Sequence, residues 1–292
     1  MSQIKKPIAS IIIVNYNNAK YLKKSLDSAI RQSFKNKEII VVDDISNDNS
    51  LKILEKYKKK IKFYINKKKT NIGSYNQINS YYNGILKSKG KYLFLLDSDD
   101  YFKQNKVEEI IKKFNESNSK KILFDLPILK FKKKLVLKKF IQKNFILSSW
   151  PRFTPQSCIS IERNYAIKIF KILKIKKYPT IWLDFRIATI SFLYYKKIFI
   201  FNKYLTYYRQ LDGSASKKYK TMSKNWWVRR REAHEFFSNI SKKLNIKSRL
   251  TFDEVITKLV NIFIPYSSFG DINSVRLPRF IDQLKNGILW FC

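Results

Sequence analysis

Aspartates gather at two places in a chain that is otherwise poor in acidic residues. The 292 residues include 22 aspartates and glutamates against 60 lysines and arginines. Each cluster directly follows an apolar run that is typical of a buried strand. The clusters are Asp43, Asp44 and Asp48 after Ile39–Val42, and Asp97, Asp99 and Asp100 after Tyr92–Leu96. Carboxylates this close together repel one another unless a cation or hydrogen-bond donors hold them. Such oxygen ligands suit Mg²⁺ or Mn²⁺ when phosphate oxygens complete the coordination.

Helix capping offers a simpler explanation for each cluster. Ser, Asn and Asp side chains satisfy the first backbone N–H groups of a helix, and helices are expected from Ser46 or Asn47 and from Lys106. A cap needs only one such residue, however, and it does not need the pair Asp43 and Asp44 before it. A carboxylate there can accept a hydrogen bond from a nucleobase N–H, in a cleft where phosphates meet the metal. The two clusters together therefore predict a nucleotide and metal site.

The elements that position these aspartates alternate between strand and helix patterns over residues 1–126. Strands are expected at Ile8–Val14, Glu38–Val42, Ile61–Ile65, Tyr92–Leu96 and Lys121–Leu126, with helices after Asn18, after Ser46 or Asn47, after the turn Asn71–Gly73, and over Lys106–Phe114. This alternation predicts an α/β fold with a mostly parallel sheet flanked by helices. Ligands of such sheets bind beyond the carboxyl ends of the strands, which is where both clusters fall.

Five segments in this order carry a resemblance to a known family. They are Ser10–Asn17, Ser28–Phe34, Val41–Ser50, Asn71–Gly73 and Leu95–Asp100. Together they resemble the family-2 glycosyltransferases of the GT-A fold, over roughly residues 8–210. The resemblance implies an inverting transfer of a sugar from a nucleoside diphosphate donor. It also implies three parts: a nucleotide-sugar-binding half (1–126), an acceptor-binding half (127–216), and a basic helical extension (217–292).

The resemblance assigns roles to individual residues. The nucleotide site would contain Asn15, Tyr16, Asp44, Asn71, Gly73 and Asp97, with Asp44 facing the base, most often uracil. Asp97, Asp99 and Asp100 would hold Mn²⁺ or Mg²⁺ against the diphosphate. The metal would neutralise the charge that develops on the leaving group, while the sugar passes through an oxocarbenium-like state.

The transfer also needs a carboxylate that takes the proton from the acceptor hydroxyl. Between Leu126 and Leu211 only Glu162 and Asp184 are acidic. Asp184 occupies the second position of the family's Glu-Asp pair and is the expected base, although Leu183 stands where the family has glutamate. A helix N-terminal acid that interacts with the macrodipole is the alternative, and Asp125 is the second candidate for the base.

Two short strands are expected near Ile198–Phe201 and Leu205–Tyr208. The segment after them departs from the family. Many members carry a histidine there, whereas this chain has Leu211 and Asp212. Arg209 or Ser214 could meet the diphosphate instead. The single histidine, His234, falls in an amphipathic helical pattern and is expected to be packed or solvated.

The net charge of +38 predicts a polyanionic partner or reflects compositional drift. Seven lysines alternate with apolar residues in 130–143, and a similar pattern recurs in 276–291. This pattern suits an anionic membrane surface, and the expected acceptor is a glycan or lipid-linked glycan of a cell-surface polysaccharide. Trp226 and Trp227 beside three arginines could stack on nucleic acid, but their helical spacing favours packing, so nucleic acid is not the expected partner. The alternative is a basic nucleic-acid- or membrane-binding protein on an inactive GT-A fold.

Location is predicted from weaker signals. Two cysteines, Cys158 and Cys292, fit a reducing compartment. The first residues lack a signal-peptide layout, and no apolar run reaches 18 residues. A cytoplasmic protein at the inner face of the membrane is expected.

Overall fold

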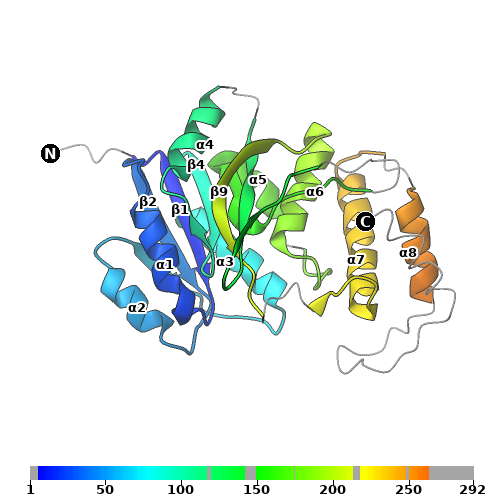
Figure 1. Ribbon diagram of the computed structural model, residues 1–292. Helices are drawn as coiled ribbons and strands as arrows, with labels where there is room; N and C mark the ends of the chain where they lie inside the picture. Colours follow the sequence, from blue (N-terminus) through cyan, green and yellow to red (C-terminus); the bar gives the residue numbers. More distant parts are fainter. Residues whose placement is uncertain are drawn as a thin grey trace. The chain divides into compact units, whose positions relative to one another are not determined.

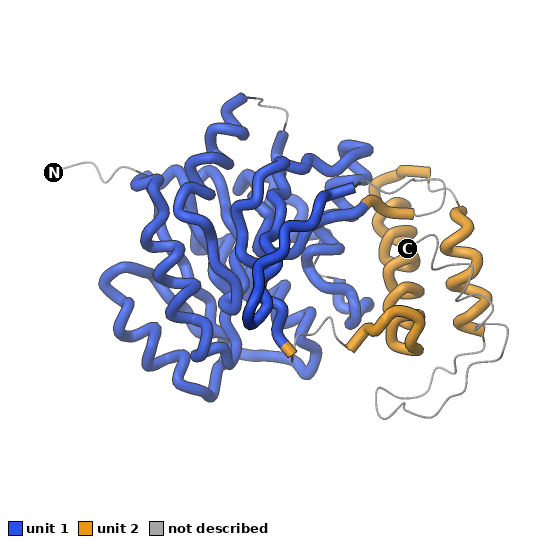
Figure 2. The backbone as a smooth tube through the Cα atoms, in the orientation of Figure 1, with its two compact units in different colours: residues 1–141, 152–211 blue, residues 142–151, 212–292 orange. Residues whose placement is uncertain are grey.

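The computed structural model describes residues 6–116, 120–141, 149–173, 175–212, 218–247 and 250–262 (Figure 1). It forms two compact units, one of residues 1–141 with 152–211 and one of residues 142–151 with 212–292 (Figure 2). The expected boundary at residue 126 falls inside the first unit, so a division there into nucleotide and acceptor halves stays a prediction. Helix α7 and helix α8 of the expected extension belong to the second unit.

The first unit is built on one sheet, which contains nine strands among the described residues. Its strands are β1 (Ala9–Asn15), β2 (Lys37–Asp43), β3 (Lys62–Ile65), β4 (Tyr92–Asp97), β5 (Tyr101–Phe102), β6 (Ile122–Lys130), β7 (Leu135–Leu137), β8 (Ile159–Glu162) and β9 (Ile200–Arg209). Strands β3, β2, β1 and β4 run parallel in this order, as the sequence predicts. Both aspartate clusters therefore begin at one edge of the sheet.

The rest of the sheet is mixed, so antiparallel pairs continue the parallel part that the sequence predicts. Strand β8 lies between β4 and β6 and is antiparallel to both. Strand β6 pairs in parallel with β9, and short β5 and β7 pair antiparallel with β9 and β6. Strand β8 is four residues long and lies far from its partners in the sequence, so no alternation pattern marks it.

Strand β9 replaces the two short strands expected near residues 198–201 and 205–208. The polar residues Asn202 and Lys203 interrupt the apolar pattern of β9. The register against β6 shifts at these residues: Asp125 pairs with Phe201, but the next residue, Leu126, pairs with Tyr204. A β-bulge keeps the chain in one strand while it changes which side chains face the core. Thr206 and Arg209 both follow the bulge in strand β9.

Helices cover both faces of the sheet. They are α1 (Ala19–Ile30), α2 (Ser50–Tyr57), α3 (Gly73–Lys87), α4 (Lys106–Asn115), α5 (Arg163–Leu173) and α6 (Leu183–Tyr195), with the 3₁₀ turn η1 (Gln156–Cys158). Ile11 and Ile13 share a buried cluster with residues of α1, α2 and α4. The alternate residue Ile12 faces α3, where Gly84 permits close approach, since a Cβ at Gly84 would lie 2.5 Å from Ile12 Cγ2. Strand alternation thus sorts the helices between the two faces.

The second unit contains α7 (Lys224–Lys243) and α8 (Phe252–Ile262). Trp227 is buried with Met222 and Val260, so its ring is packed, as its spacing predicts. His234 is also buried, and its Nε2 lies 3.3 Å from Asp253 Oδ2. The basic segment 276–291 lies outside the described residues. Across the described ranges, no helix combines the length and the apolar character needed to span a membrane.

Candidate active site

Asp97 ends β4 and lies against helix α3. The Tyr81 hydroxyl donates a hydrogen bond of 2.8 Å to Asp97 Oδ1, and Gln77 Nε2 lies 3.3 Å from the same oxygen. Burial, followed by the nearby charges of Asp99 and Asp184, raises the pKa of Asp97 to about 7. Asp184 belongs to helix α6, so the charge at the start of α6 acts on the end of β4.

Asp100 is held by two hydrogen bonds from distant parts of the sequence. The Ser157 hydroxyl donates to Oδ2 at 2.6 Å, and the backbone N–H of Arg209 donates to Oδ1 at 2.8 Å. Burial, together with Asp99 and Asp97, raises the pKa of Asp100 well above its ordinary value. Both carboxylate oxygens are thus already used inside the protein.

Asp99 lies between these two residues. Burial raises its pKa, and the positive charge of Arg209 opposes this shift. The Arg209 guanidinium donates to the backbone carbonyl of Asp99 and lies over the rings of Tyr21 and Tyr101, at 5.0 and 4.8 Å from their centroids. The hydrogen bonds therefore leave the Asp99 carboxylate more available to a ligand than that of Asp100.

Tyr208 marks the point where the acidic side chains converge. Burial raises the pKa of its hydroxyl well above the ordinary value, and the charges of Asp100, Asp184, Asp97 and Asp99 raise it further. Four carboxylates from β4, the following loop and α6 thus act on one hydroxyl of β9. The structure brings together all four acids to which the sequence analysis assigned catalytic or metal-binding roles.

The N-terminus of α6, which carries Asp184, is attached to the N-terminus of α3. The Ser74 hydroxyl donates to the backbone carbonyl of Pro179 at 2.6 Å. At Gly73, a Cβ would lie 3.2 Å from Cη2 of Trp182, so the absence of a side chain at Gly73 permits this close approach. Further on, the buried Arg186 donates to four backbone carbonyls, those of Leu173, Ile175, Tyr178 and Ile181. These contacts fix the loop that presents Asp184.

A second group of residues lies beyond β1 and β2. Asp44 is 5% exposed, and Asn66 Nδ2 donates to its Oδ1 at 2.8 Å. Burial raises the pKa of Asp44, while Asn66 and the charge of Lys69 oppose the shift. Lys69 Nζ also lies 3.3 Å from the hydroxyl of Tyr16, whose side chain is exposed. Tyr16, Asp44 and Lys69 therefore form one neighbourhood with an exposed aromatic ring beside a carboxylate.

Two of the predicted nucleotide residues are placed differently. Asn15 is fully buried, and its amide donates to Asp43 Oδ2 at 2.7 Å and to Ser46 Oγ at 3.2 Å, so this side chain organises the loop after β2. Asn71 is exposed, and among the described contacts none joins it to Asp97 or Asp44. Its role in nucleotide binding stays a prediction.

The residues fit a divalent cation only in part. In the described ranges, no three His, Cys, Asp or Glu side chains are arranged as a group that could hold a metal ion. The crowded carboxylates of Asp97 and Asp99 would nevertheless be stabilised by a cation. Such an ion would take its other ligands from the diphosphate, which is the usual way in which Mg²⁺ is held at phosphate-binding sites.

Four polar residues of the site escaped the sequence analysis: Gln77, Tyr81, Ser157 and Tyr208. Gln77 and Tyr81 are four residues apart in a helix that was expected, so a polar pair on one helical face was the available signal. Ser157 and Tyr208 come from segments with no acidic pattern, and only the assembled sheet places them beside Asp97 and Asp100.

Comparison with known proteins agrees with this geometry. Residues 10–149 match the sequence model of Glycosyl transferase family 2. An uncharacterised glycosyltransferase of Rickettsia prowazekii is 40% identical over 120 residues, which are 41% of this chain and 36% of that protein. One from Nostoc is 29% identical over 215 residues, 68% of this chain and 64% of that protein. The aligned segments thus span from about a third to just under two thirds of these relatives.

The structural comparison extends over almost the whole chain. The crystal structure of residues 1–349 of Staphylococcus aureus TarS in complex with UDP-GlcNAc has a TM-score of 0.59 at 20% identity, and the match covers 97% of this chain and 81% of that one. TarS is a poly(ribitol-phosphate) β-N-acetylglucosaminyltransferase. At this identity the likeness shows the fold. The chain has the GT-A fold, and its residues 10–149 are similar to the family-2 glycosyltransferases.

Proposed function

We propose that the protein is an inverting glycosyltransferase that moves a sugar from a UDP-sugar to a hydroxyl of a glycan or lipid-linked acceptor, in the synthesis of a cell-surface polysaccharide. The observation that carries this proposal is that Asp97, Asp99 and Asp100 share one loop against helix α3, and that the segment leading to Asp184 is joined to the start of the same helix by the Ser74–Pro179 hydrogen bond and the close approach of Trp182 to Gly73. A structural scaffold gains nothing from four such carboxylates, because burying like charges together destabilises the folded state. A reaction that handles a proton and a diphosphate needs them.

In the proposed reaction Asp184 acts as the base, and Asp97 and Asp99 hold the cation. The acceptor oxygen attacks the anomeric carbon, the bond from that carbon to the diphosphate breaks, and Asp184 takes the acceptor proton. Its place in the first turn of α6 puts the carboxylate within electrostatic reach of Asp97. A Mn²⁺ or Mg²⁺ ion, when bound at Asp97 and Asp99, would stabilise negative charge on the leaving diphosphate.

The nucleotide is proposed to bind beside Tyr16 and Asp44. Tyr16 is 47% exposed and offers a ring face for base stacking, and the Asp44 carboxylate can accept the N3–H of uracil. The complex of the structurally similar TarS with UDP-GlcNAc supports a uridine nucleotide here. Lys69, which lies over the Tyr16 ring at 4.7 Å, adds positive charge at the same place.

The test of the proposed function is nucleotide release from a panel of UDP-, GDP-, dTDP- and CMP-sugars, each with and without Mn²⁺ and without acceptor. Slow hydrolysis of one donor that depends on the cation is the expected result. Release from no donor, together with no binding of UDP by calorimetry, would contradict the proposal and favour an inactive GT-A fold.

Asp44→Asn is expected to weaken UDP binding by about 10- to 100-fold, because a hydrogen bond between a charged group and its ligand contributes about 1.5–3 kcal/mol. Calorimetry with UDP measures this change. Asp27→Asn is the matched control, since Asp27 pairs with Lys23 on the surface of α1 away from the site. Equal affinity of both variants for UDP would contradict the assignment of Asp44 to the base.

The protein is further proposed to act at the inner face of the cell membrane. Leu135, Leu137 and Ile141 are each more than half exposed, and five lysines alternate with them in the segment 132–139. An exposed apolar edge strand among lysines suits an interface of anionic lipids.

We expect co-sedimentation with vesicles that contain 30% phosphatidylserine, and release by 0.5 M NaCl because salt screens the attraction. Replacing Lys133, Lys134 and Lys138 with glutamate is expected to abolish it, while the same change at the α2 lysines Lys52, Lys56 and Lys58 leaves it. Protein that stays in solution at low salt would contradict the membrane proposal.

A further inference from the structure

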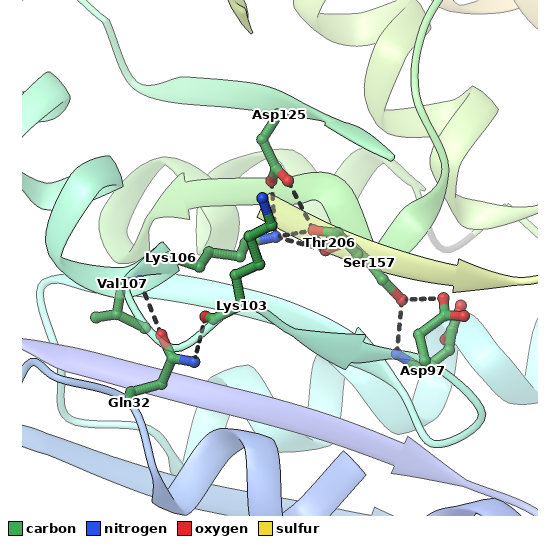
Figure 3. A network of polar contacts seen from close by, with 9 residues as sticks. Gln32, Asp97, Lys103, Lys106, Val107, Asp125, Ser157 and Thr206 are labelled. Carbon is green, nitrogen blue, oxygen red and sulfur yellow. Dashed lines mark hydrogen bonds and ion pairs between the residues drawn. The ribbon is translucent and has the colours of Figure 1, made fainter. Parts of the chain in front are cut away.

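Behind the aspartates lies a fully buried polar network, which we call the Lys106 network and which consists of Lys106, Asp125, Ser157 and Thr206 (Figure 3). Lys106 Nζ lies 2.7 Å from Asp125 Oδ1, and all four residues have no exposed surface. The ammonium also donates to the Thr206 hydroxyl at 2.6 Å and to the backbone carbonyl of Ser157 at 2.7 Å. The Thr206 hydroxyl in turn donates to Asp125 Oδ2 at 2.6 Å.

The network joins four elements that are distant in the sequence. Lys106 begins α4, Asp125 lies in β6, Ser157 in η1 and Thr206 in β9. The start of α4 is itself held by the buried Gln32, which donates to the carbonyl of Lys103 at 2.7 Å and accepts from the N–H of Val107 at 3.0 Å (Figure 3). The backbone position of Lys106 is therefore fixed, and its side chain can orient the other elements.

Ser157 connects this network to the site. Its carbonyl accepts from Lys106, while its hydroxyl points the other way, donates to Asp100 Oδ2 at 2.6 Å and accepts from the N–H of Asp97 at 3.0 Å (Figure 3). Thr206 makes a second connection, because Arg209 on the same strand donates its N–H to Asp100 Oδ1. The ammonium of Lys106 thus contacts Ser157, which donates one of the two hydrogen bonds to Asp100, and Thr206, which lies three residues before the donor of the other one.

A buried ion pair is a weak source of stability. The loss of hydration offsets most of the attraction, and apolar residues of similar volume often replace such a pair without destabilising the fold. The four residues of the Lys106 network have no exposed surface. The hydrogen bonds of the network lead to the loop of residues 97–100.

We infer that Lys106 and Asp125 are positioning residues of the active site: through Ser157 and Thr206 they fix the loop of residues 97–100, and so set where Asp97 and Asp99 meet the donor diphosphate. The inference rests on the proposed function for its effect on turnover, but its structural part is independent of it. It also gives Asp125 a role that is neither that of a base nor that of a plain core residue.

The test replaces the ion pair with two apolar side chains, K106M together with D125L. The double variant is expected to fold, to keep the affinity of the wild type for UDP within about threefold, and to lose about 10²-fold in kcat for hydrolysis of UDP-GlcNAc, the scale expected for a misplaced catalytic group. The matched control is K121M with E162Q, which removes an ion pair of 2.8 Å between the start of β6 and the end of β8. The control is expected to keep both kcat and KM.

Amide hydrogen exchange provides a readout that does not depend on activity. The N–H groups of Asp97 and Arg209 are donors in the two hydrogen bonds that involve Ser157 and Asp100, so their protection is expected to fall on the order of tenfold in K106M/D125L and to stay unchanged in the control. Ser157→Ala, which removes only the hydroxyl, is expected to reproduce the loss at Asp97 and serves if the double variant does not fold.

The outcomes separate the two proposals. A wild type that hydrolyses no donor would contradict the proposed function, while the exchange experiment would still decide the inference. A folded double variant with unchanged protection at Asp97 and Arg209, or with unchanged kcat in an active protein, would overturn the inference and leave the Lys106 network as a core contact.

Discussion

Asp184→Asn is expected to lower kcat for sugar transfer by about 10²- to 10⁴-fold, the range that general-base catalysis contributes. Asparagine has the same shape as aspartate but does not accept the acceptor proton. The proposed nucleotide site lies beyond β1 and β2, so the affinity for UDP is expected to stay within about twofold. Steady-state transfer with the donor identified by the panel, together with calorimetry with UDP, measures both quantities.

A matched control is available for this prediction. Glu162 is the other acid between Leu126 and Leu211, and it pairs with Lys121 at 2.8 Å at the end of β8. Glu162→Gln is expected to leave transfer unchanged. If Asp184→Asn retains transfer within tenfold of the wild type, the base lies elsewhere. The place of Asp184 in the first turn of α6 would then reflect interaction with the helix dipole.

Asp99→Asn is expected to remove the stimulation of turnover by Mn²⁺ and to lower kcat/KM by at least about 10²-fold, because a bound cation contributes several kcal/mol of charge stabilisation in such reactions. The Asp99 carboxylate carries fewer hydrogen bonds than that of Asp100, so its loss is expected to change the melting temperature little. Metal binding is measured separately by the electron paramagnetic resonance of free Mn²⁺ in the presence of UDP.

Asp100→Asn distinguishes a ligand from a structural residue at this loop. Its carboxylate oxygens accept from Ser157 and Arg209, so this change is expected to destabilise the fold more than Asp99→Asn does. Glu55→Gln on α2, at an exposed ion pair with Lys58, is the neutral control. An Asp99→Asn protein with the Mn²⁺ response of the wild type would contradict the proposed metal site.

The parallel half of the fold and the position of the acids were predictable because both follow from local patterns. Continuous β-branched runs such as Ile8–Val14 indicate strands buried on both faces. An acid directly after such a run lies at the carboxyl end of the strand. Asp97 and Asp44 could therefore be assigned to one edge of the sheet from the sequence. The GT-A resemblance then added Asp184, which no spacing rule connects to Asp97.

The antiparallel strands and the polar contacts behind the acids were not predictable in this way. Strand β8 is too short to show alternation, and the bulge in β9 is recognisable only once β6 lies beside it. Asn15 shows a different difficulty: the resemblance assigned it to the nucleotide site, while in the structure its amide donates to Asp43, so its contact with a nucleotide stays a prediction. A motif specifies which side chains are near a ligand, but hydrogen-bond partners decide which of them remain free to contact it.

The order of the elements along the chain has a consequence for biosynthesis. The parallel strands β1 to β4 and their helices are complete by residue 115, but Ser157, Asp184 and Arg209 follow much later, and β9 pairs with β6 across about 80 residues. Because a chain folds from its N-terminal part first during synthesis, the nascent protein exposes Asp100 before Ser157 and Arg209, the two donors that hold it, have been made. The loop of residues 97–100 therefore acquires its full set of hydrogen bonds only after residue 209 has emerged, and a ribosome-bound chain stalled before that point contains both aspartate clusters but lacks the completed site.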